Sequence, residues 1–247
     1  MNLSPVQSDF VNQWQRVQKH ILSQSSLFSK LGDLIAGSLD SGNVLHVFGS
    51  GHSHVIAEEM FHRAGGLVQV NAILEDYLMP HAGPSRVGTL ERTPGVYSGI
   101  FKSHDFKSGE FLIISSNSGI NAVSIEVAKE AKNLGLNTIA ITSLTHSQAV
   151  PSRFFDTKLF EECDYVIDTG TERGDACVSV PGLEIKACPL SGVANLFIAQ
   201  YLVANIIEAF TKRAKVPPIY QSANTPGGDE HNKLLEEQYK NRIQHLK

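Results

Sequence analysis

Short apolar segments alternate with helical patterns through the middle of this 247-residue chain. The segments 43–48, 67–70, 111–115, 138–142 and 165–168 are mostly apolar, without a strict alternation of apolar and polar residues. Such strands are buried on both faces, as parallel strands are when helices cover both sides of their sheet. The pattern therefore predicts an α/β fold with a parallel sheet, in which ligands bind at the carboxyl ends of the strands.

Helical patterns fill the connections and the N-terminal region. The first forty residues carry an apolar residue at every third or fourth position, with a break expected at 23–26. Helices are also expected at 55–64 and at 122–134, where Gly135 ends the second. Because 42% of the 247 residues are hydrophobic, the chain is long enough to bury one sizeable core. We therefore expect one domain, over residues 1–247, with appendages.

The C-terminal part carries a strongly apolar helix and a polar tail. Residues 193–210 are apolar nearly all round the predicted helix, which indicates a deeply buried or subunit-bridging position. Beyond Pro217, a polar turn at 222–229 precedes a last predicted helix at 232–246. Since apolar helices lie towards both ends, a lone monomer is the least expected state, and a homodimer or homotetramer is expected.

Charge and composition exclude several classes of partner. A net charge of −4 provides no electrostatic footprint for nucleic acid. No apolar run approaches the roughly 20 residues that span a bilayer, and residues 1–7 lack the pattern of a signal peptide. The three cysteines match neither a disulfide framework nor a zinc knuckle. We therefore expect a cytoplasmic protein that binds neither nucleic acid nor membrane.

A long segment interrupts the alternation of strands and helices. Residues 72–109 separate the second and third predicted strands by more than one helix needs. They are rich in Pro and Gly and contain His81, Glu91 and Arg92 among other polar residues. Segments of this length in compact domains are usually functional or disordered.

The clearest chemical signal is the serine-rich turn at 115–119. The apolar segment 111–115 runs directly into Ser116-Asn117-Ser118-Gly119, and a helix is expected from residue 122. Such a turn offers main-chain N–H groups, hydroxyls and an amide beside the positive end of a helix dipole, which favours a phosphate dianion. Asn121 stands where a helix N-cap or a phosphate ligand belongs. The alternative is that the serines only cap the helix.

A second turn follows the first predicted strand. Gly49-Ser50-Gly51-His52-Ser53-His54 has the same strand–turn–helix setting, so the two turns can surround one small anion. A dinucleotide fingerprint is disfavoured, because His54 replaces its third glycine and the nearest acidic residue past the second strand is Glu75. No G-x-S-x-G nucleophile elbow occurs in the chain.

These motifs carry a resemblance to a known family. Ser116-Asn-Ser118-Gly-Ile-Asn121, followed by Glu130-Ala-Lys-Asn-Leu-Gly and the strand 138–142, resembles the signature of phosphosugar-binding SIS domains over roughly residues 35–210. The preceding turn Lys107-Ser-Gly-Glu110 agrees with it. Within that class, a set of further motifs resembles a phosphoheptose isomerase-like subfamily: His52-Ser-His54, Ala57-Glu-Glu59, His62-Arg-Ala-Gly-Gly66, Ser222-Ala-Asn224 and Asp229-Glu-His231-Asn232.

The resemblance implies a fold and a set of site residues. SIS domains are three-layer sandwiches with a five-stranded parallel sheet in flavodoxin-like order, and two subunits usually build their sites together. The core would lie at 35–210, after an N-terminal helical segment 1–34 and before a tail 217–247. Carried over by position, the phosphate- and substrate-binding residues are Gly51, His52, Ser53, Ser116, Asn117, Ser118 and Asn121.

Aldose–ketose isomerisation also needs a base that moves a proton between neighbouring carbons and a donor near the carbonyl oxygen. Glu58 and Glu59 lie on the helix after the second turn, and because adjacent helical residues point about 100° apart, only one is expected to face the site. Glu59 is the favoured base. His54, and His231 of the tail, are the candidate imidazoles. Phosphoheptose isomerase carries its catalytic glutamate further along this helix, near the position of Arg63.

Three functions remain open at this point. The first is a phosphosugar isomerase with a carboxylate/His pair, the second a non-catalytic phosphosugar sensor, and the third an amino-sugar-phosphate lyase or etherase. A zinc site from His52, His54 and a glutamate is disfavoured, because the two histidines lack a third ligand at metal-binding spacing. We therefore expect no metal and no cofactor.

Overall fold

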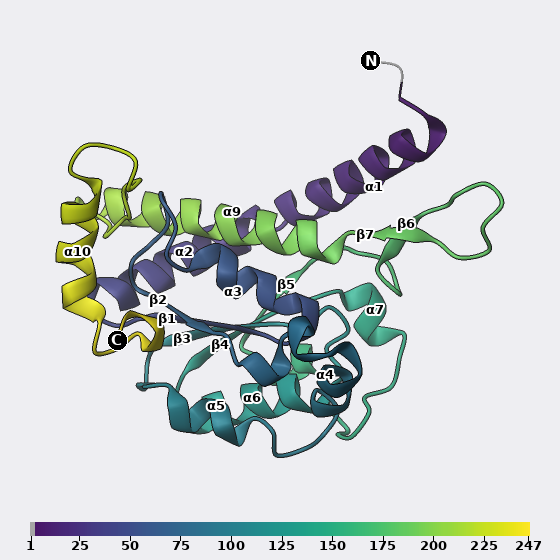
Figure 1. The fold of residues 1–247 in the computed structure, drawn as a ribbon, viewed down its shortest axis with the longest axis horizontal. Helices are drawn as coiled ribbons and strands as arrows, with labels where there is room; N and C mark the ends of the chain where they lie inside the picture. The colour runs from purple at the N-terminus through teal and green to yellow at the C-terminus, as the bar shows by residue number, and fades with distance from the viewer. Residues whose placement is uncertain (1–2) are drawn as a thin grey trace.

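The structure is a computed structural model that describes residues 3–247. Its centre is a sheet of parallel strands in the order β2-β1-β3-β4-β5. The strands are β1 (Leu45–Gly49), β2 (Val70–Ile73), β3 (Phe111–Ser115), β4 (Asn137–Thr142) and β5 (Tyr165–Asp168). Helices cover both faces of this sheet (Figure 1), so the predicted three-layer α/β class and five-stranded parallel sheet are confirmed.

Strand side chains point alternately into the two helical layers. Val47 of β1 and Ile113 of β3 belong to the core on one side of the sheet, whereas Phe48 and Ile114 belong to the core on the other side. All four side chains are almost completely buried. Because both layers are apolar, the strand segments had to be apolar at successive positions.

One face is covered by α1 (Pro5–Leu22), α2 (Ser25–Asp40), α3 (Val55–Met60) and α9 (Ser191–Lys212). The expectation that no apolar run reaches bilayer length is not met by α9, which passes as a membrane-spanning helix by length and composition alone. Of its apolar window, 50% is buried inside the molecule. Ile198 and Leu202 of α9 share one core with Leu31 and Ile35 of α2. Packing against α2 therefore accounts for the buried half of this apolar window.

The segment 72–109 is folded into short helices that, with α6 and α8, make up the second layer. The elements are η2 (Asp76–Leu78), η3 (Pro80–Ala82), α4 (Pro84–Leu90), α5 (Ser98–Ser103), α6 (Ala122–Asn133) and α8 (Leu159–Glu162). A further short helix, α7 (Leu144–Gln148), follows β4. In Figure 1 α4 and α7 lie at the same end of the molecule, near the carboxyl ends of the strands.

Several boundaries differ from the predicted ones because of contacts with the tail. The second strand begins at Val70 rather than at residue 67, since Leu67 forms a bridge to Ile219 and the Val68 N–H donates to the carbonyl of Pro218 at 2.9 Å. The helix expected at 55–64 ends at Met60, and His62 adopts a left-handed conformation with φ 44°.

The C-terminal region also differs in detail from the predicted pattern. Its helix α10 (Gly228–Tyr239) begins four residues before the predicted 232–246, and the 3₁₀ turn η4 (Gln244–Leu246) follows it. An antiparallel hairpin, β6 (Ala176–Val178) with β7 (Ala187–Pro189), has no counterpart in the sequence pattern. Strands of three residues are too short to show a period in the sequence.

A buried charged cluster holds the C-terminal segment against the sheet. The Glu110 side chain is fully buried and accepts hydrogen bonds from His46 Nε2 at 2.8 Å and from Arg242 Nη2 at 2.6 Å. The main-chain N–H groups of Val44 and Lys107 also donate to this carboxylate. Burial alone would raise the pKa of Glu110, but the bonds from His46 and Arg242 bring it to about 2. The carboxylate is therefore ionised and paired at neutral pH.

Candidate functional site

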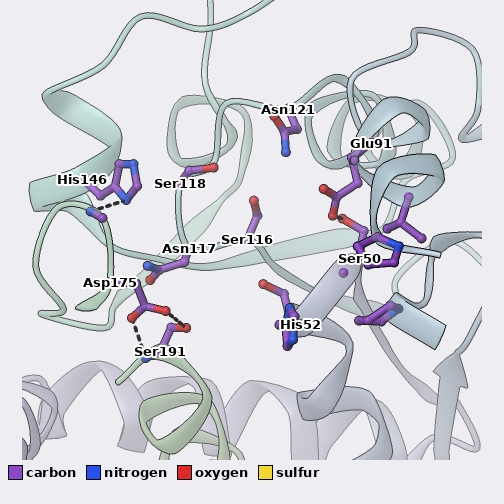
Figure 2. A pocket seen from close by; sticks show the side chains of 17 residues that line it. Ser50, His52, Glu91, Ser116, Asn117, Ser118, Asn121, His146, Asp175 and Ser191 are labelled. Atoms are coloured by element: carbon purple, nitrogen blue, oxygen red, sulfur yellow. Dashed lines mark hydrogen bonds between the residues drawn. The ribbon is translucent and has the colours of Figure 1, made fainter. Parts of the chain in front are cut away.

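The two polar turns lie side by side at the carboxyl ends of neighbouring strands. Gly49 at the end of β1 is in register with Ser115 at the end of β3, and the strand order reverses at this pair. Ligands in open α/β sheets bind at such a switch point. Residues of both turns line one cavity of about 350 Å³, the main cavity, shown in Figure 2. That volume falls in the range of small-molecule sites.

The turn after β3 has a shape that strongly favours glycine at its fourth position. Gly119 has φ +61°, and a Cβ there would lie 3.1 Å from Thr142 Oγ1 and 3.2 Å from Ser147 Oγ. The Gly119 N–H donates to Ser116 Oγ at 3.2 Å, while the Ser116 N–H donates to the carbonyl of Ile141. These contacts bend the chain immediately after the strand.

The bend leaves several N–H donors without a protein partner. Within residues 3–247, the main-chain N–H groups of Asn117, Ser118, Ile120 and Asn121 donate to no protein acceptor. Asn121 occupies the N-cap position of α6, yet its side chain does not cap the helix, and its Oδ1 is buried without a partner. No described side chain therefore caps the N-terminus of α6. Free N–H groups at the start of a helix are a suitable place for an anion to bind.

The turn after β1 forms the opposite rim and is braced by a glutamate. The residues of η1 (Gly51–His54) include three that line the main cavity, namely Gly51, His52 and Ser53. Ser50 Oγ donates to Glu91 Oε1 at 2.7 Å. Gly51 has φ +56°, and a Cβ there would lie 2.8 Å from the same Glu91 oxygen, so the carboxylate packs directly on the turn.

Glu91 connects the two turns. It follows α4, and its main-chain carbonyl accepts a hydrogen bond from the N–H of Val123 in the first turn of α6 at 3.1 Å. Its side chain lines the main cavity beside Ser50, as Figure 2 shows. The sequence patterns assign no role to Glu91, and the only signal that points to it is the unusual length of the segment 72–109.

The wall opposite Glu91 carries an imidazole and a second carboxylate. His146 of α7 accepts at Nδ1 from the Gly174 N–H at 3.4 Å, which leaves Nε2 to carry the proton. Burial, and then the charge of Arg173, lower the pKa of His146, although Asp175 acts in the opposite direction. The imidazole is therefore neutral at neutral pH. Asp175 accepts from the N–H and the hydroxyl of Ser191, at the start of α9.

All seven residues expected to bind phosphate or substrate line the main cavity: Gly51, His52, Ser53, Ser116, Asn117, Ser118 and Asn121. Asn117 is partly engaged within the protein, since its Oδ1 accepts from Thr171 Oγ1 at 2.9 Å. Ser115 ends β3, and its buried hydroxyl has no hydrogen-bond partner.

The residues expected to act as acid and base lie outside the main cavity in this chain. Glu59 pairs with Arg63 and accepts from Gln200 Nε2 at 2.7 Å, because α3 packs its side against α9. Glu58 lies 3.4 Å from His54 Nε2 and is half exposed. The Nδ1 of His54 bonds to the Gly51 carbonyl. Neither carboxylate of α3 therefore lines the main cavity.

His231 lies still further away. Its Nε2 donates to the carbonyl of Ile219 at 2.9 Å, and it lines a separate cavity with Leu39 and Tyr239. In Figure 1 its helix α10 lies at the end of the molecule opposite α4 and α7. Among residues 3–247, no three His, Cys, Asp or Glu side chains converge in a way that suits a metal ion.

Comparison with known proteins places the chain in a family. A family model for the SIS domain matches residues 9–143, more than half of the chain. The chain belongs to the SIS-domain family. A UPF0309 protein of Thermoanaerobacter pseudethanolicus is 41% identical, over 94% of this chain and 96% of the relative. The SIS resemblance of the turn motifs is thereby confirmed, whereas the expected core limits, 35–210, remain a prediction.

Solved structures show the same fold at low sequence identity. A phosphoheptose isomerase from Francisella tularensis superimposes with a TM-score of 0.54 at 15% identity, covering 81% of this chain and 95% of that protein. A phosphoheptose isomerase from Neisseria gonorrhoeae gives a TM-score of 0.50 at 16% identity, covering 83% of this chain and 96% of that protein. At this identity the likeness concerns the fold alone.

Proposed function

We propose that this SIS-domain protein binds a phosphosugar, with the phosphate held at the start of α6. The supporting observation is the set of unpartnered N–H groups of Asn117, Ser118, Ile120 and Asn121. They stand beside the hydroxyls of Ser116 and Ser118 and the positive end of a helix dipole. Ser53 and His52 complete the grip from the turn after β1. The remaining volume of the main cavity accommodates the sugar.

We further propose that the bound sugar is isomerised between aldose and ketose forms. Glu91 is the base that moves the proton between neighbouring carbons, and it is oriented by Ser50. His146, which is neutral with its proton on Nε2, donates to the carbonyl oxygen from the opposite wall. This proposal keeps a carboxylate/His pair but transfers the carboxylate role from Glu59 to Glu91, because Glu91 lines the cavity.

Binding and turnover are tested separately. Thermal shift measurements on a panel of sugar phosphates identify those that stabilise the chain. Proton NMR in D₂O then follows loss of the proton on the carbon next to the carbonyl. Stabilisation together with exchange supports an isomerase. Stabilisation without exchange or turnover would contradict the isomerase proposal and favour a phosphosugar sensor.

Replacing Ser116 and Ser118 together by Ala is expected to abolish the thermal shift caused by every sugar phosphate. The double change removes two hydroxyl donors, and Ser116 Oγ also bonds to the Gly119 N–H that shapes the turn. Ser124→Ala is the matched control, because Ser124 lies on α6 and its hydroxyl bonds to the Asn121 carbonyl outside the cavity lining. Retention of binding in the double variant would contradict the phosphate assignment.

We also propose that the protein works as a homodimer or homotetramer in the cytoplasm. Helix α1 and the β6–β7 hairpin project from the body (Figure 1), and Leu183 and Ile185 of the hairpin are 58% and 77% exposed. A second copy that covers these side chains is expected. Size-exclusion chromatography with light scattering should give at least twice the mass of one chain, and a single-chain mass would contradict this proposal.

The free thiols of Cys163, Cys177 and Cys188 suit a reducing compartment such as the proposed cytoplasm.

A further inference from the structure

A second cavity adjoins the main cavity. It has a volume of about 550 Å³ and is lined by Arg92, Ile120, His146 and residues 150–154. We call it the arginine cavity, after Arg92 and Arg153. His146 lines both cavities, and Arg92 and Ile120 directly follow or precede the main-cavity residues Glu91 and Asn121. The two cavities therefore meet at His146.

The two cavities have opposite charge. The described lining of the main cavity contains the carboxylates of Glu91 and Asp175 and no Lys or Arg side chain. The arginine cavity contains two guanidinium groups and no carboxylate among its described lining residues. Because the phosphate grip at the start of α6 uses uncharged donors, these two guanidinium groups are not needed for the first phosphate.

Both guanidinium groups are free to bind a ligand. In residues 3–247, neither the exposed Arg92 side chain nor the exposed Arg153 side chain forms an ion pair or a hydrogen bond with a protein group. Arg86 and Arg173 are also unpaired within the described chain, but of these four arginines only Arg92 and Arg153 line a cavity. The main chain anchors both residues: the Arg92 N–H donates to Thr89, and the Arg153 N–H donates to Ile120. The buried hydroxyl of Ser152 in the same lining also lacks a partner.

We propose that the arginine cavity is a second anion subsite. The ligand then carries an acidic group, a second phosphate or a carboxylate, in addition to the phosphate held at the start of α6. A planar guanidinium offers paired N–H donors that match the oxygens of either group. This inference rests on the proposed function, because it names the class of phosphosugar that the site takes.

Calorimetric titration with three sugars tests the subsite. Glucose 6-phosphate carries one anionic group, whereas glucose 1,6-bisphosphate and 6-phosphogluconate carry a second phosphate and a carboxylate. At least one of the two doubly anionic sugars is expected to bind about 10-fold or more tightly than glucose 6-phosphate, which corresponds to about 1.4 kcal/mol. Which of them does so identifies the second group. Equal affinity for all three would overturn the proposal.

Substitution of the two arginines tests whether they cause the preference for a doubly anionic sugar. Arg92→Ala with Arg153→Ala is expected to bring the affinity ratio to about one and to leave the affinity for glucose 6-phosphate unchanged. Arg86→Ala is the matched control, because Arg86 is an exposed arginine of α4 that lines neither cavity. A preference that survives the double change would show that the arginines are only solvated surface charges, and would overturn the assignment.

The same titrations distinguish failure of the subsite from failure of the proposed function. If glucose 6-phosphate binds the wild-type chain but not the Ser116→Ala, Ser118→Ala variant, the phosphate site is supported. That result does not depend on the ratio of affinities for doubly anionic sugars and glucose 6-phosphate. If no sugar phosphate on the broader panel binds the wild-type chain, the proposed function itself fails, and the subsite proposal fails with it.

Discussion

Glu91→Gln is expected to lower the rate of proton exchange at the carbon next to the sugar carbonyl by about 10²–10⁴-fold, the usual contribution of a positioned general base. Glutamine has the same shape and still accepts a hydrogen bond from Ser50 Oγ, which lies 2.7 Å from Glu91 Oε1. The turn after β1 should therefore keep its form. The amide cannot take the substrate proton, so exchange is lost while the affinity for the phosphosugar remains within a few-fold.

Glu59→Gln is the matched comparison. Its carboxylate is held by Arg63 and Gln200 on the α9 side of α3, away from the main cavity. Exchange measured by NMR in D₂O should therefore remain near the wild-type rate. The reverse outcome, loss in Glu59→Gln and retention in Glu91→Gln, would assign the base to Glu59 and remove Glu91 from the mechanism.

Glu110→Ala is expected to lower the free energy of unfolding by about 3–5 kcal/mol, the cost of removing one partner from a buried ion pair. Without the carboxylate, Arg242 keeps only its pair with Asp105, and the N–H groups of Val44 and Lys107 lose their acceptor. Urea unfolding measures the loss. Glu237→Ala is the control, since Glu237 pairs with Lys240 on the surface and such pairs contribute about 1 kcal/mol or less. Equal effects of the two changes would contradict this account.

The same cluster predicts that stability declines in acid. The pKa of Glu110 is about 2 in the folded protein against an ordinary 4.5, so its contribution is complete above 4.5 and is lost as the pH falls towards 2. Burial is the largest influence on His46 and lowers its pKa below the ordinary 6.5, against the effect of its bond to Glu110. The unfolded chain therefore binds a proton near 6.5 that the folded protein does not. Urea unfolding between about pH 7 and pH 4 should show a falling free energy.

The sheet was predictable because burial on both faces requires apolar residues at successive positions of each strand. The strand β3, its serine-rich turn and the helix α6 follow one another in the chain. Their residue types alone therefore indicate a buried strand, a polar turn and a helix start. The strand β2 was displaced in the prediction, since Leu67 and Val68 pair with Ile219 and Pro218, which lie about 150 residues further along the chain. No local pattern records that pairing.

The two polar turns and the proposed acid–base residues also differ in how far the sequence predicts them. Each turn is made of consecutive residues between a strand and a helix, so the sequence alone was sufficient to propose seven lining residues. A catalytic carboxylate has to meet those turns from elsewhere. Proximity along the chain favoured Glu59, which the rotation of α3 directs towards α9. Only the folding of residues 72–109 over the sheet edge brings Glu91 to Ser50, because that contact depends on how separate elements pack rather than on any neighbouring residue.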